Sequence, residues 1–148
     1  MHEMTASQAR GAFPSLQDAA ALHEPTRITR RRGAAAVLLS EEDFDALLAR
    51  FSFSPEVFFE ADAVSIWLPE LGIWGRGNSF GEARDSLLDE IDQFLALVSE
   101  DARFRTSAEM LERLPWVFRL SRLSDDADRL ALLFSPPAPT LTSGIERT

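Results

Sequence analysis

Few side chains in this sequence could perform catalysis. There is no cysteine, and the only histidines are His2 and His23. A serine–histidine–acid site needs a histidine that an acid orients beside the serine, and nothing near either histidine indicates such an arrangement. The sequence also has no phosphate-binding glycine loop, no dinucleotide-binding glycine signature and no HExxH zinc motif. We therefore expect a protein that is not an enzyme and needs no cofactor.

One pair of acids could bind a metal ion. Glu60 and Asp62 are two residues apart, so both carboxylates would share one face if the segment were a β-strand. Carboxylate oxygens are ligands for divalent cations, which keeps a metal-dependent nuclease as an alternative. Paired acids beside a turn are far more often solvated, and we expect no metal site.

Charge is unevenly distributed along the chain. All 15 basic residues are arginines, and with 24 acids the net charge is −9. Residues 10–32 hold five arginines and two acids, a net charge of +3, whereas residues 51–148 hold nine arginines and 17 acids, a net charge of −8. Guanidinium groups bind DNA phosphates and guanine edges, while an acidic surface favours a basic protein partner. This polarity predicts two binding activities on one chain; the alternative is that the halves of any small protein differ by several charges.

The arginines near the N-terminus are the candidates for DNA contacts. Arg10 lies about one turn into a predicted helix, and Arg30, Arg31 and Arg32 cluster at the tip of a predicted hairpin. A helix start beside a basic ribbon could clamp a duplex. The alternative is that these arginines only solvate the surface.

The elements expected over residues 1–51 are a helix, a hairpin and a second helix. The segment from Thr5 to Gln8 has the form of a capping box, and the helix that follows should kink or restart at Pro14. Strands are expected at 27–30 and 35–39, with a turn at Arg32-Gly33, and Ser40 should cap the second helix.

Beyond a joint at 52–55, the pattern changes to strands and then helices. Three strands are expected at 57–59, 64–68 and 73–77, followed by a long helix from Ser79 to about Glu100. A short helix from Thr106 should stop at Pro115, the segment 116–120 is of uncertain structure, and Ser124-Asp125-Asp126 should cap a last helix. The predicted fold class is α+β, with a polar tail at 135–148 that we expect to be disordered.

Three segments of the first part carry a family resemblance: Ala9-Arg10, Ile28-Thr29-Arg30, and Ala36-Val37-Leu38-Leu39-Ser40-Glu41-Glu42-Asp43-Phe44. Over about residues 3–51 the chain resembles the Phd/YefM antitoxins. The resemblance implies a dimerisation unit that binds the operator of its own operon, with a C-terminal part that neutralises a toxin. It favours Arg10 as a DNA contact, with Arg30, Arg31, Arg32, Thr5 and Ser7 as further candidates.

The next part is similar to the HicB-type antitoxin domain, a partial RNase H-like sheet with a helix. The similarity covers about residues 57–100 and rests on the runs Val64-Ser65-Ile66-Trp67-Leu68-Pro69-Glu70-Leu71 and Gly75-Arg76-Gly77-Asn78-Ser79-Phe80-Gly81-Glu82-Ala83. Ile73-Trp74 departs from the glycine-cysteine that this family usually has. The similarity implies the fold more strongly than any activity.

The candidate toxin surface lies in the acidic part of the chain. It includes an acidic helix face, whose alternative is ordinary solvation, and apolar anchors that could equally close the core of the second domain. The acidic face is Glu82, Asp85, Asp89 and Asp92, and the anchors are Trp116, Phe118, Leu130, Leu133 and Phe134.

Together these patterns predict a type II antitoxin that represses its operon. We expect a DNA-binding and dimerisation domain at 1–51, a HicB-like α+β domain at 56–100, a helical arm at 101–134 and the tail. The expected partners are a cognate toxin, operator DNA and a second copy, in a dimer or a higher oligomer. No apolar run approaches the ~20 residues of a membrane span, so we expect a soluble cytoplasmic protein. A protein-interaction adaptor without DNA binding is the alternative.

Overall fold

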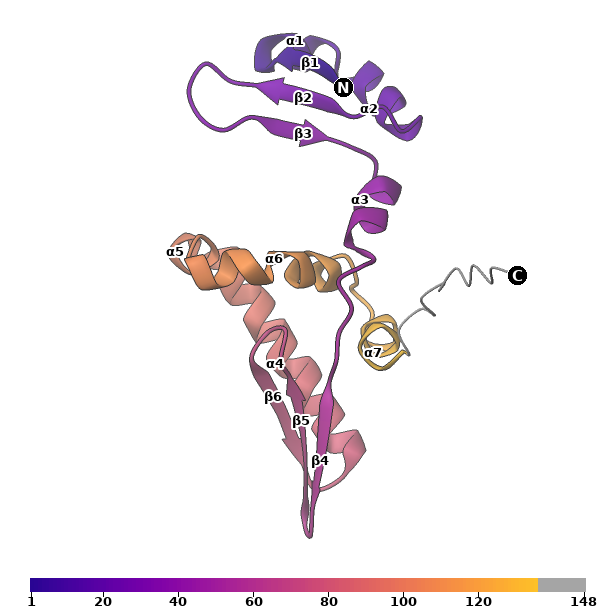
Figure 1. The fold of residues 1–148 in the computed structure, drawn as a ribbon, viewed down its shortest axis with the longest axis vertical. Coiled ribbons are helices and arrows are strands. Elements are labelled where there is room, and N and C mark those ends of the chain that lie inside the picture. Colours follow the sequence, from indigo (N-terminus) through magenta and orange to yellow (C-terminus); the bar gives the residue numbers. More distant parts are fainter. Residues whose placement is uncertain (136–148) are drawn as a thin grey trace, which may run out of the picture. The chain divides into compact units, whose positions relative to one another are not determined.

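The computed structural model describes residues 1–135 and divides the chain into two compact units, Met1–Arg50 and a second that begins at Phe51 (Figure 1). Both units combine helices with a small three-stranded sheet, so the predicted α+β class is confirmed. The tail predicted to be disordered lies outside the described residues, apart from Ser135.

The first unit contains one mixed sheet with the strand order β1-β2-β3. Strand β2 pairs in parallel with β1 and antiparallel with β3. The elements in chain order are β1 (His2–Thr5), α1 (Ala6–Gly11), α2 (Phe13–Ala21), β2 (Thr26–Thr29), β3 (Ala36–Leu38) and α3 (Glu41–Leu48). The predicted helices and hairpin are therefore present, and both hairpin strands lie within one residue of the expected bounds.

Strand β1 is absent from the sequence-based prediction. Its four residues show no period-2 alternation of apolar and polar side chains, and all but Met4 are exposed. The strand exists because its backbone pairs with β2, more than twenty residues along the chain, in the register Thr5 opposite Thr29. Short-range patterns cannot indicate a strand whose stabilising hydrogen bonds are this distant in sequence.

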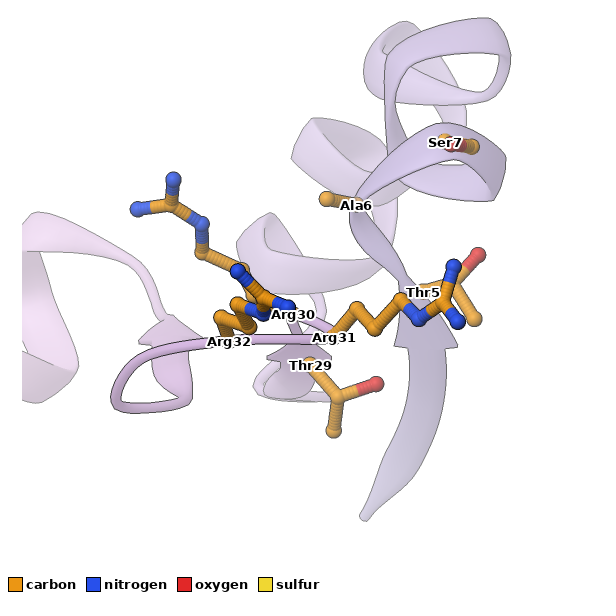
Figure 2. Close-up of a pocket in the computed structure, with 7 residues that line it drawn as sticks. All are labelled: Thr5, Ala6, Ser7, Thr29, Arg30, Arg31 and Arg32. Carbon is orange, nitrogen blue, oxygen red and sulfur yellow. The ribbon is translucent and has the colours of Figure 1, made fainter.

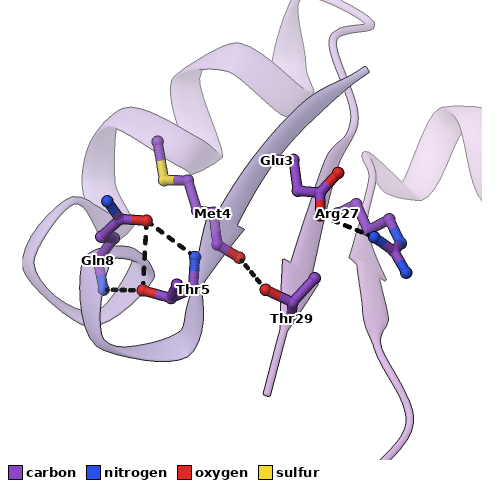
Figure 3. Close-up of polar contacts among 6 residues, drawn as sticks. All are labelled: Glu3, Met4, Thr5, Gln8, Arg27 and Thr29. Atoms are coloured by element: carbon purple, nitrogen blue, oxygen red, sulfur yellow. Dashed lines mark hydrogen bonds and ion pairs between the residues drawn. The ribbon is translucent and has the colours of Figure 1, made fainter. Parts of the chain in front are cut away.

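Local sequence signals mark the starts of α1 and α2, a capping box in the first and a proline in the second. The Thr5 hydroxyl accepts a hydrogen bond from the Gln8 amide at 3.2 Å, and the Gln8 side chain accepts one from the Thr5 amide at 2.9 Å (Figure 3). This capping box satisfies two of the amides that a helix start leaves free. Pro14 occupies the first turn of α2, where its missing amide costs nothing. The predicted restart at Pro14 is confirmed.

The second unit begins with an antiparallel meander, β4 (Glu56–Glu60), β5 (Ala63–Leu68) and β6 (Ile73–Gly77). The long helix α4 (Phe80–Glu100) follows, capped by Ser79, and Figure 1 shows it running beside the sheet. The three strands and the helix agree with the prediction. Three shorter helices complete the unit: α5 (Ala102–Arg105), α6 (Ala108–Ser121) and α7 (Asp126–Phe134).

The predicted end of a helix at Pro115 is wrong, because α6 continues through this residue to Ser121. Proline removes the bond to the carbonyl of Leu111, but Leu111 is exposed, where water can solvate that carbonyl. Beyond the proline, Val117 and Leu120 are buried in the core. Their burial favours continued helix over a break at the proline.

The helices after residue 101 are part of the core of the second unit. Met110 and Val117 from α6 and Leu133 from α7 belong to the same buried cluster as Ile66 and Leu87 from the sheet and α4. Arg129 is 8% exposed and forms an ion pair with Asp92 of α4. Residues 101–134 therefore do not form a separate arm.

The tightest packing in this unit is between β6 and α4. A Cβ atom at Gly75 would lie 2.3 Å from the Ala83 carbonyl oxygen and 2.6 Å from Leu87 Cβ. Only glycine allows the backbones to come so close. This contact fixes α4 on one face of the sheet.

We predict that Gly75→Ala destabilises the protein by about 1–3 kcal/mol, because the added methyl group forces the helix away from the strand. Urea denaturation followed by circular dichroism measures the change. Gly81→Ala is the matched control, since its Cβ would meet nothing closer than Ser79 Oγ at 3.9 Å, and it should leave stability unchanged or raise it. Equal stabilities of the Gly75→Ala variant and the wild type would show that the sheet and helix can separate at no cost.

Candidate functional site

A basic hollow on the first unit collects most of the residues predicted to bind DNA. It has a volume of about 760 Å³ and opens to the surface. Figure 2 shows its lining side chains, which come from the end of β1 and the start of α1 and from the end of β2 with the loop that follows; they are Thr5, Ala6, Ser7, Thr29, Arg30, Arg31 and Arg32. The structure thus brings together five of the six predicted residues. We call this feature the basic hollow.

The pairing of β1 with β2 creates this arrangement. Both strands run in the same direction and end level with each other, because Thr5 lies opposite Thr29. The Thr29 hydroxyl also donates a hydrogen bond to the Met4 carbonyl at 3.2 Å (Figure 3). The residues after each strand, the first turn of α1 and the arginine loop, are therefore held side by side.

The three arginines of the loop are free to bind an anion. Arg30, Arg31 and Arg32 are exposed, and within the described residues none forms an ion pair with an acid. Figure 2 shows their side chains fanning out from the loop. Gly33 follows with a φ of 107°, which allows the chain to turn directly after them. Uncompensated guanidinium groups on a turn can each donate to a phosphate.

The other candidates differ in their contributions. The Thr5 hydroxyl is occupied by the capping box with Gln8, so its role at this site is to position α1. Ser7 is exposed in the first turn of α1, and its side chain lines the hollow. Arg10 is exposed in the last turn of α1 but does not line the hollow. Any contact from Arg10 would therefore extend the site along the helix.

The residues predicted to bind a toxin are mostly engaged within the second unit. Leu133 is 1% exposed, which excludes it as a partner contact in the folded chain. Trp116 donates to the Ser52 carbonyl at 2.9 Å and stacks edge-on against Phe51, and Phe134 packs against Phe80. Leu130 is half-buried. Phe118 alone of the five is exposed, at 42%.

The acid pair Glu60 and Asp62 does not have the strand geometry that would place both carboxylates on one face. Glu60 is the last residue of β4, and Asp62 lies in the turn that follows, so the two do not share a strand face. Among residues 1–135, no group of three histidines or acids is placed to hold a metal ion.

The sequence did not indicate a second feature of the first unit, an apolar groove of about 450 Å³. Its exposed large apolar residues are Met1, Val37 and Leu47, exposed at 78%, 49% and 64%. The polar edge is His23, whose Nδ1 lies 2.7 Å from Asp43 Oδ1. The full lining is Met1, His23, Pro25, Val37, Leu39, Asp43, Ala46 and Leu47. No local pattern signals this groove, because its walls come from four separate segments.

The chain is similar over most of its length to proteins described as antitoxins. A sequence model of the family PHD_like, described as an antitoxin of toxin–antitoxin systems of the RelE/RelB kind, matches residues 1–134. A solved structure from Syntrophomonas wolfei subsp. wolfei, described as the antitoxin part of a proposed toxin/antitoxin system, is 16% identical with a TM-score of 0.76. The match covers 89% of this chain and 96% of that one, and it shows a shared fold. No curated protein matches. None of the helices within residues 1–135 is long and apolar enough to span a membrane.

The contact between His23 and Asp43 gives a prediction for pH dependence. The hydrogen bond and the negative charge of Asp43, with a smaller effect of Glu42, raise the pKa of His23 above 6.5. The protonated form is favoured in the folded state, so its contribution to stability is complete below pH 6.5 and is lost as the pH rises through the raised pKa. An NMR titration of the imidazole should show this elevation, and Asp43→Asn should remove most of it. An unchanged pKa in Asp43→Asn would exclude this ion pair as the cause.

Proposed function

This chain belongs to the PHD-like antitoxin family of toxin–antitoxin systems, and from that premise we propose that it neutralises a cognate toxin and represses its own operon. In this proposal the first unit binds operator DNA and the second unit binds the toxin. The protein acts by binding and carries out no catalysis. The first unit works as a Phd/YefM-like dimer, and the sheet and helix of the second unit act as a HicB-like domain.

The basic hollow is the observation that carries the DNA-binding proposal. Three arginines without acidic partners among the described residues line the hollow together with Ser7, at one end of a small sheet. Arginine binds phosphate oxygens in a bidentate manner and also recognises guanine in the major groove. The first unit as a whole has a net charge near zero, so it is the local concentration of arginines that favours DNA here.

The apolar groove supports dimerisation through the first unit. Val37, Leu47 and Met1 of the first unit are exposed around one groove. Burying these side chains against a second copy would be favourable by about 25 cal/mol per Å² of apolar surface. A symmetric dimer would present two basic hollows. Two sites on one operator increase the affinity through the effective concentration of the second contact.

The second unit has the charge expected of a partner for a basic protein. From residue 51 the chain holds 17 acids against nine arginines. Complementary potentials accelerate association and select the right partner. Of the predicted anchors, Phe118 is the most exposed, whereas Leu133 belongs to the core.

Replacing the loop arginines tests operator binding. Arg30→Ala, Arg31→Ala and Arg32→Ala combined should weaken binding to a duplex from the chain's own promoter, and each lost phosphate contact should flatten the logarithmic salt dependence by about 0.9. Arg10→Ala should weaken binding as well, and unchanged affinity would remove Arg10 from the site. Gel-shift titrations at several salt concentrations measure both effects.

The matched control for these variants is Arg27→Ala. Arg27 is an exposed arginine of the same unit, but it pairs with Glu3 at 2.8 Å and does not line the basic hollow (Figure 3). Its replacement should leave the affinity and salt dependence unchanged. If wild-type protein binds no promoter duplex at physiological salt, the adaptor alternative replaces DNA binding.

Dividing the chain at its unit boundary tests toxin neutralisation. Cells that express the cognate toxin should grow when the full chain is present but not when a fragment of residues 1–50 is present at the same level. The same fragment should retain DNA binding, which shows that it is folded. Growth rescue by residues 1–50 would assign toxin binding to the first unit and contradict the proposal.

A further inference from the structure

One face of the second sheet carries an aromatic cluster that its own core does not use. Trp67 and Trp74 are opposite each other on β5 and β6, with ring centroids 4.7 Å apart. Phe58 of β4 adds a third ring, 5.9 Å from Trp74. The guanidinium carbon of Arg76 lies over the Trp74 ring, 5.5 Å from its centroid. We call this surface the aromatic face.

Strand alternation and the position of α4 explain why these rings are on the outside. On β5 the side chains of Val64, Ile66 and Leu68 are buried, while Ser65 and Trp67 point the other way. On β6 the close approach at Gly75 holds α4 against that buried face. The aromatic face is therefore the side of the sheet away from α4.

This face is exposed although its composition resembles that of a core. Phe58 is 45% exposed and Trp74 is 39% exposed. Clustered exposed aromatic side chains are typical of binding surfaces, where they bury large areas at a small entropic cost. The stacking contacts also hold the rings in place before any partner arrives, which lowers the cost of association.

Acidic residues border the aromatic face and indicate what covers it. Glu56 and Glu60 lie on either side of Phe58 along β4 and, with the strand period of two, on the same face. Within the described residues, neither carboxylate forms an ion pair. A partner with an apolar centre and flanking cations would satisfy both the rings and the carboxylates.

The same acids disfavour two other occupants. If β4 paired antiparallel with a second copy in the register that joins the two Phe58 rings, Glu56 of one copy would lie opposite the partner's Glu60 at both ends. Like charges in opposite positions destabilise a strand pair. A nucleic acid strand could stack on the rings, but it would meet two carboxylates and a unit with a charge of −8.

We propose that the aromatic face is the main docking surface for the toxin, with Phe58 and Trp74 as anchors and Glu56 and Glu60 as contacts to toxin arginines or lysines. This inference rests on the proposed function, since it assigns the toxin site within the second unit. It places the site on the strands and not on the helical residues around Phe118.

Binding of the purified cognate toxin to the full-length chain, measured by titration calorimetry, tests the assignment. Phe58→Ser should weaken binding by about tenfold or more, the range of an interface hot spot. The matched control is Leu97→Ser on α4, because Leu97 has the same 45% exposure as Phe58, and it should bind as the wild type does. Circular dichroism melting confirms that both variants are folded.

A charge reversal separates direct contact from general attraction. Glu56→Arg with Glu60→Arg should weaken toxin binding by about tenfold or more. Glu90→Arg with Glu100→Arg, on the exposed surface of α4, makes the same change in net charge and should have a smaller effect. Equal losses of toxin affinity in the two double variants would show that the β4 acids act only by long-range attraction, which would overturn the assignment.

The outcomes distinguish this inference from the function on which it rests. Absence of toxin binding by the wild-type chain would overturn the proposed function and the docking surface together. Toxin binding that is as tight in Phe58→Ser and in the β4 charge reversal as in the wild type would overturn the docking surface alone.

Two further measurements test other occupants of the aromatic face. A lower oligomer mass of Phe58→Ser than of the wild type in sedimentation velocity would identify the face as a contact between copies. Quenching of tryptophan fluorescence by oligouridine, lost in Phe58→Ser, would identify it as an RNA site, and either result contradicts the proposal.

Discussion

The parallel pairing of β1 with β2 is the interaction on which the candidate DNA site depends. Four residues at the N-terminus hydrogen-bond to a strand that follows two helices, and the register places Thr5 opposite Thr29. From this one constraint, the capped start of α1 and the arginine loop emerge at the same end of the sheet. Without it, Ser7 and Arg31 would belong to unrelated parts of the surface, and the guanidinium groups would have no neighbouring donors with which to bind a phosphate backbone.

A different constraint, the absence of a side chain at Gly75, organises the second unit. It allows α4 to approach β6 closely, and this contact holds the helix against one face of the meander. The helices α6 and α7 then complete the same core through Met110, Val117 and Leu133. The aromatic cluster lies on the opposite face, because α4, α6 and α7 pack into the core on the other side of the sheet. A single sheet thus provides both a core and a surface with the composition of a binding site.

The two units use charge in different ways. The first has nearly balanced charges but concentrates three unpaired arginines in one loop, which creates a local attraction for an anion. The second has a large acidic excess spread over its strands and helices. Since electrostatic attraction at physiological salt extends only about 8 Å, such a division allows one chain to attract DNA at one surface and a basic protein at another.

Structural features that depend on residues close together in the sequence could be predicted from the sequence alone. The capping box at Thr5 and Gln8, the restart at Pro14, the caps at Ser40 and Ser79, and the alternation along β5 all depend on neighbours within a few residues. The cluster of arginines at 30–32 and the acidic excess are likewise properties of composition. The resemblance to antitoxins also rested on short motifs, and the family match confirms that the chain is a member of an antitoxin family.

Only the tertiary structure decided which of these residues meet and which are available. The sequence could not reveal β1, because its hydrogen-bond partners are remote, nor the continuation of α6 through Pro115, because burial of Val117 and Leu120 stabilises it. Leu133 and Trp74 are both apolar residues of predicted elements, yet Leu133 is buried and Trp74 is on the surface. The physical reason is that burial is a property of the assembled layers: the position of α4, fixed at Gly75, determines which face of the sheet becomes core.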